Sequence, residues 1–210
     1  METILLPVGP LQANCILLSN REGECLVVDP GGEAQRIQSA AEERGWTITG
    51  ILLTHAHADH IGAAEALRAA SGAPIAAPRG EEEALSDPRL NLSAVLPGER
   101  CSLTADRLLD DGEVIEAAGL RLETLFTPGH TAGGACYLCG KTLITGDTLF
   151  CEGMGRTDFP GGDLSALITS LRRLNMLEGD VTVLPGHGPA TTLEHERRCN
   201  PYLRSHDSDD

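Results

Sequence analysis

Four strand-like apolar runs in this sequence each end, within four residues, at a histidine or an aspartate. These four polar residues are His55, His130, Asp147 and His187. Strand ends hold side chains rigidly, and several strand ends along one sheet edge can surround a common point. The pattern therefore favours a sheet-based fold and predicts that the four endings share one site.

The first ending carries the densest group of metal-competent side chains. Residues 54–60 read THAHADH and contain His55, His57, Asp59 and His60. In an extended segment, alternate side chains share a side, so His55, His57 and Asp59 converge while His60 points elsewhere. This geometry predicts one metal on the first two histidines and a neighbouring metal on Asp59 and His60. The alternative, a solvated polar loop, is disfavoured by this spacing beside a carboxylate.

Composition restricts the class of protein and its partners. The chain has 210 residues, of which 41% are hydrophobic but only 3% aromatic, so we expect a core of Leu, Ile, Val and Ala. A formal net charge of −15 argues against a nucleic-acid or anionic-membrane partner. No segment resembles a signal peptide or a membrane span. An odd number of cysteines, seven, is typical of a reducing compartment, and the cytoplasm is expected.

Strand and helix patterns alternate without a linker, which predicts one α/β domain over residues 1–210 with a frayed acidic tail at 205–210. Asp163 is expected to cap a helix whose buried face carries Leu164, Leu167, Ile168, Leu171 and Leu174. Residues 86–111 have no clear periodicity. Strands are predicted at 4–8, 14–19, 24–29 (closed by the turn 29–32), 51–53, 113–115, 120–126, 135–138, 142–145 and 181–184, and further helices at 33–44, 61–70 and 81–85.

Together the candidate ligands number five histidines and two aspartates: His55, His57, Asp59, His60, His130, Asp147 and His187. Nitrogen and oxygen donors without cysteine suit zinc, iron or manganese. Seven ligands are too many for one structural ion and suit two ions that share a bridge, for which Asp147 is the natural carboxylate. Two such cations lower the pKa of a water held between them and polarise a carbonyl, so hydrolysis needs no serine or cysteine nucleophile.

Four motifs in this order resemble the metallo-β-lactamase superfamily: THAHADH at 54–60, PGHT at 128–131, TGDTLF at 145–150 and PGHG at 185–188. The resemblance implies an αββα sandwich with two divalent metals, zinc first among them, at one edge of the facing sheets. It implies that His55, His57 and His130 bind the first metal. By the same resemblance Asp59, His60 and His187 bind the second, and Asp147 bridges the two.

Within that superfamily the chain is similar to short bacterial homologues of the glyoxalase II branch, through GRTDFPGG at 155–162, ER at 196–197 and NP at 200–201. This implies hydrolysis of S-lactoylglutathione or a related small-molecule acyl thioester by a metal-bridging hydroxide, with Asp59 and Asp147 as catalytic residues. Two departures concern glutathione: full-length members carry a helical C-terminal domain, and their GCGKFY segment is GMGRTD here. Arg156 is a candidate substrate-binding residue, or it pairs with Asp158.

Other functions are weighed against this prediction. A persulfide dioxygenase, with one iron on His55, His130 and Asp147, is the main alternative, although that group tends to have an Ala-His-Asp ending where this chain has Gly186-His187-Gly188. A nuclease is disfavoured by the acidic charge. A β-lactamase is disfavoured because no export signal is recognised. A non-catalytic metal-binding module is disfavoured because the set of candidate ligands is complete. Monomer and homodimer both remain open.

Overall fold

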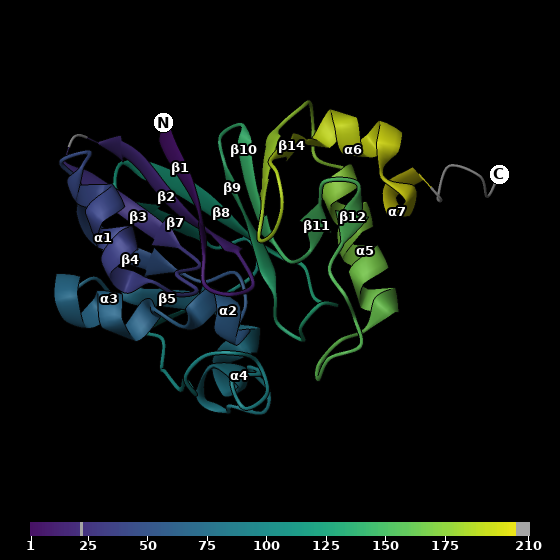
Figure 1. Ribbon diagram of the computed structural model, residues 1–210. Coiled ribbons are helices and arrows are strands. Elements are labelled where there is room, and N and C mark those ends of the chain that lie inside the picture. The colour runs from purple at the N-terminus through teal and green to yellow at the C-terminus, as the bar shows by residue number, and fades with distance from the viewer. Residues whose placement is uncertain (22, 205–210) are drawn as a thin grey trace.

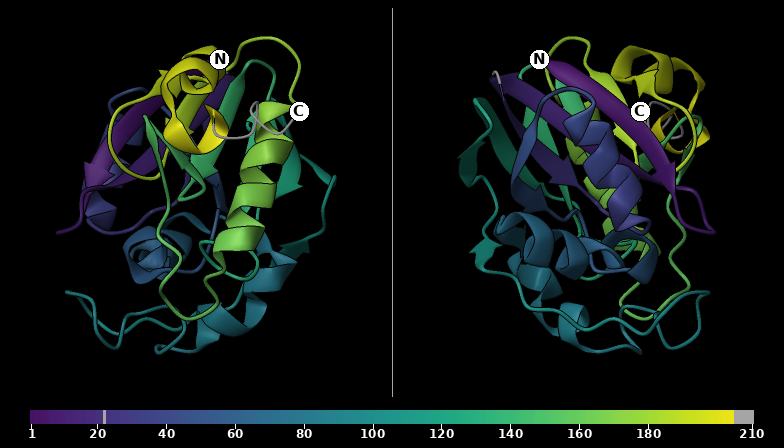
Figure 2. Two further views of the ribbon diagram at one scale, coloured as in Figure 1. Left: turned by 90° about the vertical axis from the view of Figure 1, so that its right-hand side faces the viewer. Right: turned by 60° about the vertical axis from the view of Figure 1, so that its left-hand side comes forward.

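The computed structural model describes residues 1–21 and 23–204, so the predicted frayed tail lies outside the described residues. Two six-stranded sheets pack face to face, and helices cover their outer faces (Figure 1). The two further views in Figure 2 show the same layers, with helix α5 standing outside the second sheet. The αββα sandwich expected from the sequence is confirmed.

The first sheet contains the N-terminal strands in sequence order. Its first three strands pair antiparallel, and the pairs β3–β4, β4–β5 and β5–β6 are parallel. The parallel strands therefore end along one edge, where the segments that follow β3 and β4 meet. The strands are β1 (Glu2–Val8), β2 (Ala13–Arg21), β3 (Glu24–Val28), β4 (Thr47–Leu52), β5 (Ile75–Pro78) and β6 (Arg107–Leu109).

The second sheet is mainly antiparallel, in the order β14-β13-β10-β9-β8-β7. Only the pair β10–β13 is parallel, so these two strands also end at the same edge. A short hairpin, β11 (Leu149–Phe150) and β12 (Gly153–Met154), follows β10. The sheet strands are β7 (Val114–Ala117), β8 (Leu120–Phe126), β9 (Ala135–Cys139), β10 (Thr142–Gly146), β13 (Thr182–Pro185) and β14 (Thr191–Thr192).

Alternating side chains of the strands fill three apolar layers. In β2, Ile16 and Leu18 point between the sheets, whereas Cys15 and Leu17 pack on the helix side, as the twofold period of a strand requires. The first sheet packs on α1 and α3, and the second on α5. Both faces of each sheet are buried, which explains why the aliphatic runs are nearly continuous.

The helices are short and lie outside the two sheets. As predicted, Asp163 caps α5: its Oδ1 accepts a hydrogen bond from the Ala166 N–H at 3.0 Å. Leu164, expected on the buried face, is instead 53% exposed because it lies in the first turn. The helices are α1 (Ala34–Glu42), α2 (Ala58–Ile61), α3 (Ala64–Ser71), α4 (Glu82–Ser86), α5 (Leu164–Asn175), α6 (Leu193–Cys199) and α7 (Pro201–Arg204), with a 3₁₀ turn at Arg79–Glu81.

The segment after β4 differs from its sequence-based description. The chain was expected to remain extended through residue 60, but helix α2 begins at Ala58, with His57 at its N-cap. Asp59 and His60 therefore leave a helical turn, which brings His60 back toward the other histidines instead of away from them. Among the described residues, no helix is long and apolar enough to cross a membrane.

Candidate metal centre

Both sheets supply residues to one cluster of histidines and aspartates. His55 and His57 follow β4, and the α2 turn adds Asp59 and His60. The second sheet contributes three residues from the segments after β8, β10 and β13, namely His130, Asp147 and His187. The structure therefore brings together all seven candidate residues at the edge where the parallel strands end.

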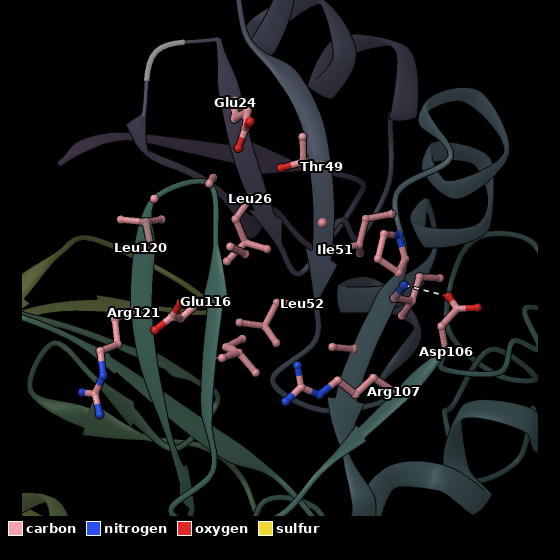
Figure 3. Close-up of a pocket in the computed structure, with 18 residues that line it drawn as sticks. Glu24, Leu26, Thr49, Ile51, Leu52, Asp106, Arg107, Glu116, Leu120 and Arg121 are labelled. Atoms are coloured by element: carbon pink, nitrogen blue, oxygen red, sulfur yellow. Dashed lines mark hydrogen bonds between the residues drawn. The ribbon is translucent and has the colours of Figure 1, made fainter.

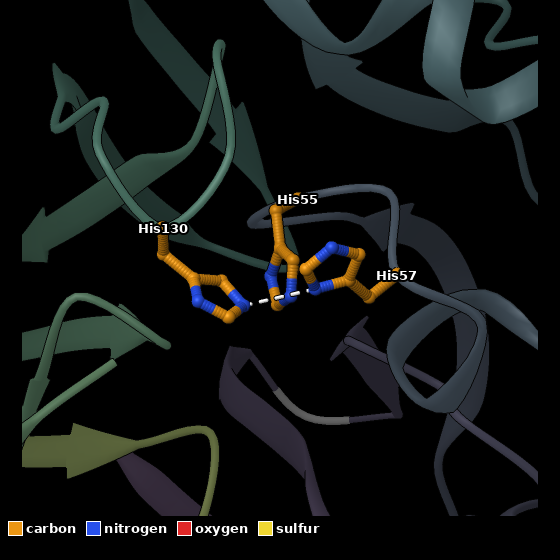
Figure 4. Close-up of side chains that lie close together, drawn as sticks. All are labelled: His55, His57 and His130. Carbon is orange, nitrogen blue, oxygen red and sulfur yellow. Dashed lines mark hydrogen bonds between the residues drawn. The ribbon is translucent and has the colours of Figure 1, made fainter. Parts of the chain in front are cut away.

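Three buried histidines form the first group. The potential donor atoms of His55, His57 and His130 all lie within 4.8 Å of one another (Figure 4). His57 Nδ1 and His130 Nε2 are 2.9 Å apart, with the two rings at 89°. When two ring nitrogens face each other, one of them must donate a proton unless something else lies between them. A shared cation accepts both lone pairs, so neither nitrogen has to donate.

A second group lies beside the first and is more open. It consists of Asp59, His60 and His187, whose donor atoms also lie within 4.8 Å of one another. His187 Nε2 is 3.2 Å from Asp59 Oδ2, and His60 Nε2 is 3.8 Å from the same oxygen. His60 is fully buried, whereas the His187 side chain is 28% exposed, so this group faces the solvent on one side.

Asp147 touches both groups. Its Oδ2 lies 3.5 Å from His130 Nε2 in the first group and 3.7 Å from His187 Nε2 in the second. The other oxygen, Oδ1, lies 3.4 Å from His60 Nε2. A carboxylate in this position can place one oxygen on each of two neighbouring cations.

Several donor atoms in this cluster are buried without a hydrogen-bond partner. They include His55 Nε2, His60 Nε2 and Asp147 Oδ1, the last at 3.4 Å from His60 but outside hydrogen-bond geometry. His57 Nε2 is a fourth such atom, and because an unsatisfied buried polar atom costs about 1–3 kcal/mol, four in one cluster need a compensating partner. A divalent cation satisfies nitrogen and carboxylate lone pairs together, and the donor set fits it.

A layer behind the cluster fixes the rings. Asp29 Oδ2 lies 3.0 Å from His60 Nδ1 and accepts a hydrogen bond from Thr54 Oγ1, which in turn is 3.0 Å from His55 Nδ1. Asp29 Oδ1 also accepts the Thr54 N–H at 2.7 Å. Through these contacts Asp29 orients two rings so that their Nε2 atoms face the cluster.

Glu81 performs a similar task for the backbone. Its buried carboxylate accepts the N–H groups of Ala56 and Gly133 at 2.8 and 2.9 Å, and so ties the segment after β4 to the segment that follows His130. Sequence reasoning missed Asp29 and Glu81. Asp29 was visible only as the start of the turn at 29–32, although its left-handed backbone (φ 51°) serves to aim a buried carboxylate.

Arg156 contributes in a way that the sequence did not suggest. Its carbonyl oxygen is 2.6 Å from His130 Nδ1, so the loop after β12 orients this ring. The guanidinium pairs with Asp158 through its Nε at 2.6 Å and stacks 4.0 Å from the centre of the Phe159 ring. The predicted pairing is therefore present, while the side chain remains 58% exposed at the edge of the site.

Burial and mutual proximity set the protonation of the rings. Burial first, then neighbouring His130, lowers the pKa of His57 to about 3, so this ring is neutral and able to bind a metal. Burial also lowers the pKa of His60, but Asp147 and Asp59 raise it more strongly, so the net shift is upward. A cation that binds His60 must therefore displace a proton.

A pocket of about 440 Å³ opens over the cluster. Its floor includes Asp59, Asp147 and His187, and Arg156 lies on its wall. Apolar side chains from three separate loops and the β11–β12 hairpin complete the wall: Leu11, Leu92, Leu96, Phe150, Met154 and Phe159. The site can thus hold a ligand that has a polar reacting group and an apolar body.

A larger hollow of about 800 Å³ lies elsewhere, between β4 and β5 of the first sheet and the β7–β8 hairpin of the second (Figure 3). Leu52 and Leu120 face it, and Arg107 and Arg121 lie at its rim. None of the seven clustered residues lines it. Its size alone does not relate it to the chemistry of the metal centre.

Comparison with known families agrees with this architecture. The model of the metallo-β-lactamase superfamily matches residues 8–187. The chain therefore belongs to the metallo-β-lactamase superfamily, as its motifs indicated.

Two curated relatives cover almost the whole chain. The probable metallo-hydrolase YqgX of Bacillus subtilis is 42% identical over 202 residues, which are 94% of this chain and 95% of the relative. The hydroxyacylglutathione hydrolase GloC of Haemophilus influenzae is 37% identical over 210 residues, which are 98% of this chain and 99% of the relative. GloC is named as a hydroxyacylglutathione hydrolase, which is the activity implied by the resemblance to the glyoxalase II branch.

Two solved structures with different functional descriptions share this fold. The B3 metallo-β-lactamase BLEG-1 superposes with a TM-score of 0.91 at 36% identity, covering 96% of this chain and 99% of that one. The protein TTHA1623, solved in a di-iron-bound form, gives a TM-score of 0.85 at 35% identity, with 95% and 100% coverage. Similarity at this level defines the fold and the superfamily, but its members differ in substrate and metal.

Proposed function

We propose that this protein is a binuclear metal-dependent hydrolase that cleaves acyl thioesters in the manner of glyoxalase II. One observation carries the proposal: two groups of three ligands lie side by side, and Asp147 contacts members of both. His55, His57 and His130 would hold one divalent ion, and Asp59, His60 and His187 the other. The di-iron form of TTHA1623 supports two ions in such a site and keeps iron beside zinc as the candidate metal.

Two bound cations supply a water of lowered pKa and a Lewis acid for the substrate carbonyl. The protein's own groups set the conditions for this chemistry. Asp59 is ionised: although burial raises its pKa, His60 and His187 lower it more strongly. With Asp147 it supplies the negative charge that holds cations at the floor of the pocket, on the side that substrate can reach. Asp29 and Glu81 keep the surrounding segments in place from behind.

The pocket supports a thioester as substrate. Its apolar wall, built in part by Phe150, Met154 and Phe159, suits the acyl and thiol portions, and the exposed Arg156 can contact a carboxylate of the carrier. The similarity to GloC, a hydroxyacylglutathione hydrolase, supports glutathione as the carrier. The free state of all seven cysteines supports a reducing compartment, the cytoplasm, in which such carriers are abundant as thiols. Because the sheets share one apolar layer, we treat the chain as a single domain.

A substrate panel tests the proposal directly. Purified protein loaded with zinc, or separately with iron, is assayed for release of free thiol from S-lactoylglutathione and from acyl thioesters of other carriers. A chromogenic β-lactam is included because of the similarity to BLEG-1. We expect thioester cleavage to exceed β-lactam cleavage in kcat/KM by at least about a hundredfold. Faster β-lactam cleavage, or no thioester cleavage with either metal, overturns the proposal.

The dioxygenase alternative differs in the number of metal ions. One iron on His55, His130 and Asp147 leaves Asp59 and His187 without a role, although their donor atoms converge with that of His60. The count of ions in this centre therefore discriminates, whereas the element alone does not. Two ions in the centre support the hydrolase, and one iron there with oxygen consumption on glutathione persulfide supports the dioxygenase.

A further inference from the structure

A second group of metal-competent side chains lies outside the centre described above. Cys151 and Glu152 form the turn of the β11–β12 hairpin, and His195 lies on α6, which packs beside this hairpin (Figure 1). The cysteine sulfur, a glutamate oxygen and a histidine ring nitrogen all lie within 4.8 Å of one another. Residues far apart in sequence thus bring a thiol, a carboxylate and an imidazole to one point.

Buried polar side chains hold the two parts of this group together. Glu196, next to His195 on α6, is fully buried, and its Oε2 accepts the Glu152 N–H at 2.8 Å. Asn200, also fully buried, donates from Nδ2 to the Gly153 carbonyl at 3.0 Å. The ER and NP motifs near the end of the chain, which the metal centre does not use, thereby fasten the hairpin turn to α6.

The turn adopts a backbone that favours this grouping. Glu152 has φ 56°, a left-handed conformation that non-glycine residues rarely adopt. In this conformation its N–H reaches Glu196 while its carboxylate lies 3.0 Å from His195 Nε2. The Cys151 side chain is partly exposed, and the Glu152 and His195 side chains are 57% and 40% exposed, so an ion can enter from solvent.

We infer that Cys151, Glu152 and His195 form a third metal site, selective for a thiophilic divalent cation such as zinc. Thiolate and imidazole donors favour zinc over magnesium or calcium, and three protein donors leave one tetrahedral position for water. Donors on one zinc ion lie about 3.4–3.8 Å apart, as follows from its bond lengths. The distance of 3.0 Å between Glu152 Oε1 and His195 Nε2 is slightly shorter than that range, and no two of the three donor atoms are more than 4.8 Å apart. Binding converts the Cys151 thiol to a thiolate and releases its proton to the buffer.

The site has a structural consequence for the pocket. Phe150 and Met154, on either side of the turn, line the pocket wall over the metal centre. An ion that joins the turn to α6 holds this wall in one position. This hairpin site does not depend on which reaction the metal centre performs.

Cobalt substitution tests the site with a readout separate from activity. The seven residues of the main centre include no cysteine, so a thiolate-to-cobalt charge-transfer band in the near ultraviolet reports the third site alone. Metal-free protein is titrated with Co²⁺ as wild type, as Cys151→Ser and as Cys199→Ser, a control that removes the exposed cysteine of α6. We expect the band in the wild type and in Cys199→Ser and its complete loss in Cys151→Ser.

A second variant separates ligation from folding. His195→Ala keeps the thiol, and we expect it to weaken Co²⁺ and Zn²⁺ binding at the third site at least about tenfold. Bound zinc should fall by one ion per chain in Cys151→Ser relative to Cys199→Ser, measured after dialysis. Absence of the band in the wild type, or its persistence in Cys151→Ser, overturns the inference. Loss of thioesterase activity with the band intact would instead concern only the main centre.

Discussion

Asp29 Oδ2 lies 3.0 Å from His60 Nδ1, and this contact joins the end of β3 to the helical turn after β4. The same carboxylate receives the Thr54 hydroxyl and N–H, so a single side chain controls the position of the segment that leads into the cluster. A buried carboxylate behind a metal-binding imidazole fixes its tautomer and raises its basicity.

We therefore expect Asp29→Asn to weaken metal binding by about 10–100-fold, since the neutral amide can no longer accept from both Thr54 and His60. Zinc dissociation constants measured by competition with a chelator would show the loss. Asp87→Asn, at a partly buried aspartate that pairs with the exposed Arg89, serves as the control and should bind zinc as the wild type does. Equal affinities for both variants would contradict the positioning role.

Gly186 offers a test that changes no donor atom. A Cβ at this position would lie 2.2 Å from Asp147 Oδ1 and 2.7 Å from His60 Cε1, far inside van der Waals contact. Gly186→Ala should displace the Asp147 carboxylate, lower zinc affinity at least about tenfold and reduce kcat with it.

The matched control is Gly153→Ala in the β11–β12 hairpin, where the new methyl would meet Phe150 Cβ at 3.7 Å and the Cys151 carbonyl oxygen at 3.9 Å, both ordinary van der Waals contacts. This variant should retain the two ions of the metal centre and activity. Metal analysis together with circular dichroism distinguishes a local loss from unfolding. A metal-replete, active Gly186→Ala protein would show that the cluster tolerates displacement of Asp147.

Arg156 can be examined through its partner. Asp158 occupies the guanidinium in the substrate-free protein, and the Arg156 side chain is more than half exposed. If Arg156 contacts the carrier carboxylate, Arg156→Ala should raise KM for S-lactoylglutathione about three- to tenfold and leave kcat nearly unchanged, as expected for an exposed charged hydrogen bond.

For Asp158→Asn we expect a KM for S-lactoylglutathione equal to or below that of the wild type, because the Arg156 guanidinium no longer pairs with a carboxylate. Arg89→Ala provides a control, since Arg89 also pairs with an aspartate two residues away, Asp87, but lies outside the pocket lining. An unchanged KM in Arg156→Ala would restrict its side chain to pairing with Asp158.

Protonation of His60 makes the folding stability of the metal-free protein depend on pH. The stability of the metal-loaded protein should change with pH in the opposite direction. Its folded pKa is raised above 6.5, on balance, by Asp147 and Asp59, so its charge stabilises the metal-free protein below that pH and loses effect as pH rises through the folded value. His187 is also shifted upward, by Asp59 and Asp147 against the effect of burial. Burial lowers the folded pKa values of His55 and His57, so just below pH 6.5 the unfolded chain binds more protons at these residues than the folded protein does. Through these two residues, folding stability below pH 6.5 therefore rises with pH.

From pH 7 to about 8.5 we therefore expect the unfolding midpoint of the metal-free protein to fall. Over the same range the zinc-loaded protein should gain stability, because protons compete less for the ligands. Urea titrations of both forms in one buffer series measure the two slopes. Parallel slopes would mean that His60 is already neutral without metal.

The histidine-rich motifs were open to prediction because they are local. Residues 54–60 carry four candidate ligands in seven positions, and the strand-end pattern directed attention to Asp147 and His187. Asp29 and Glu81 were not predictable in the same way. Each acts on backbone or rings at least 25 residues away, and an isolated Asp before Pro-Gly or Glu at a helix start looks like an ordinary turn or cap residue.

The path of residues 58–60 was wrongly expected to be extended for a related reason. Alternation along a strand explains the approach of His55 and His57, but whether a short segment continues or turns into a helix depends on its contacts. The Ala58 N–H donates to Asn91 O, and Gly31 packs so closely that a Cβ there would overlap the Asp59 carbonyl. These contacts come from the unassigned region 86–111 and from the turn after β3, which local periodicity does not connect.

Because the seven clustered residues come from two different sheets, each ion in the proposed centre would also be a cross-link in the fold. The segment 55–60 belongs to one half of the sandwich and the residues from 130 to 187 to the other. Metal affinity then includes the free energy of holding the halves in register, and loosened packing between them would lower occupancy even with every ligand intact. The number of ions bound per centre would therefore report how tightly the two halves of the sandwich pack against each other.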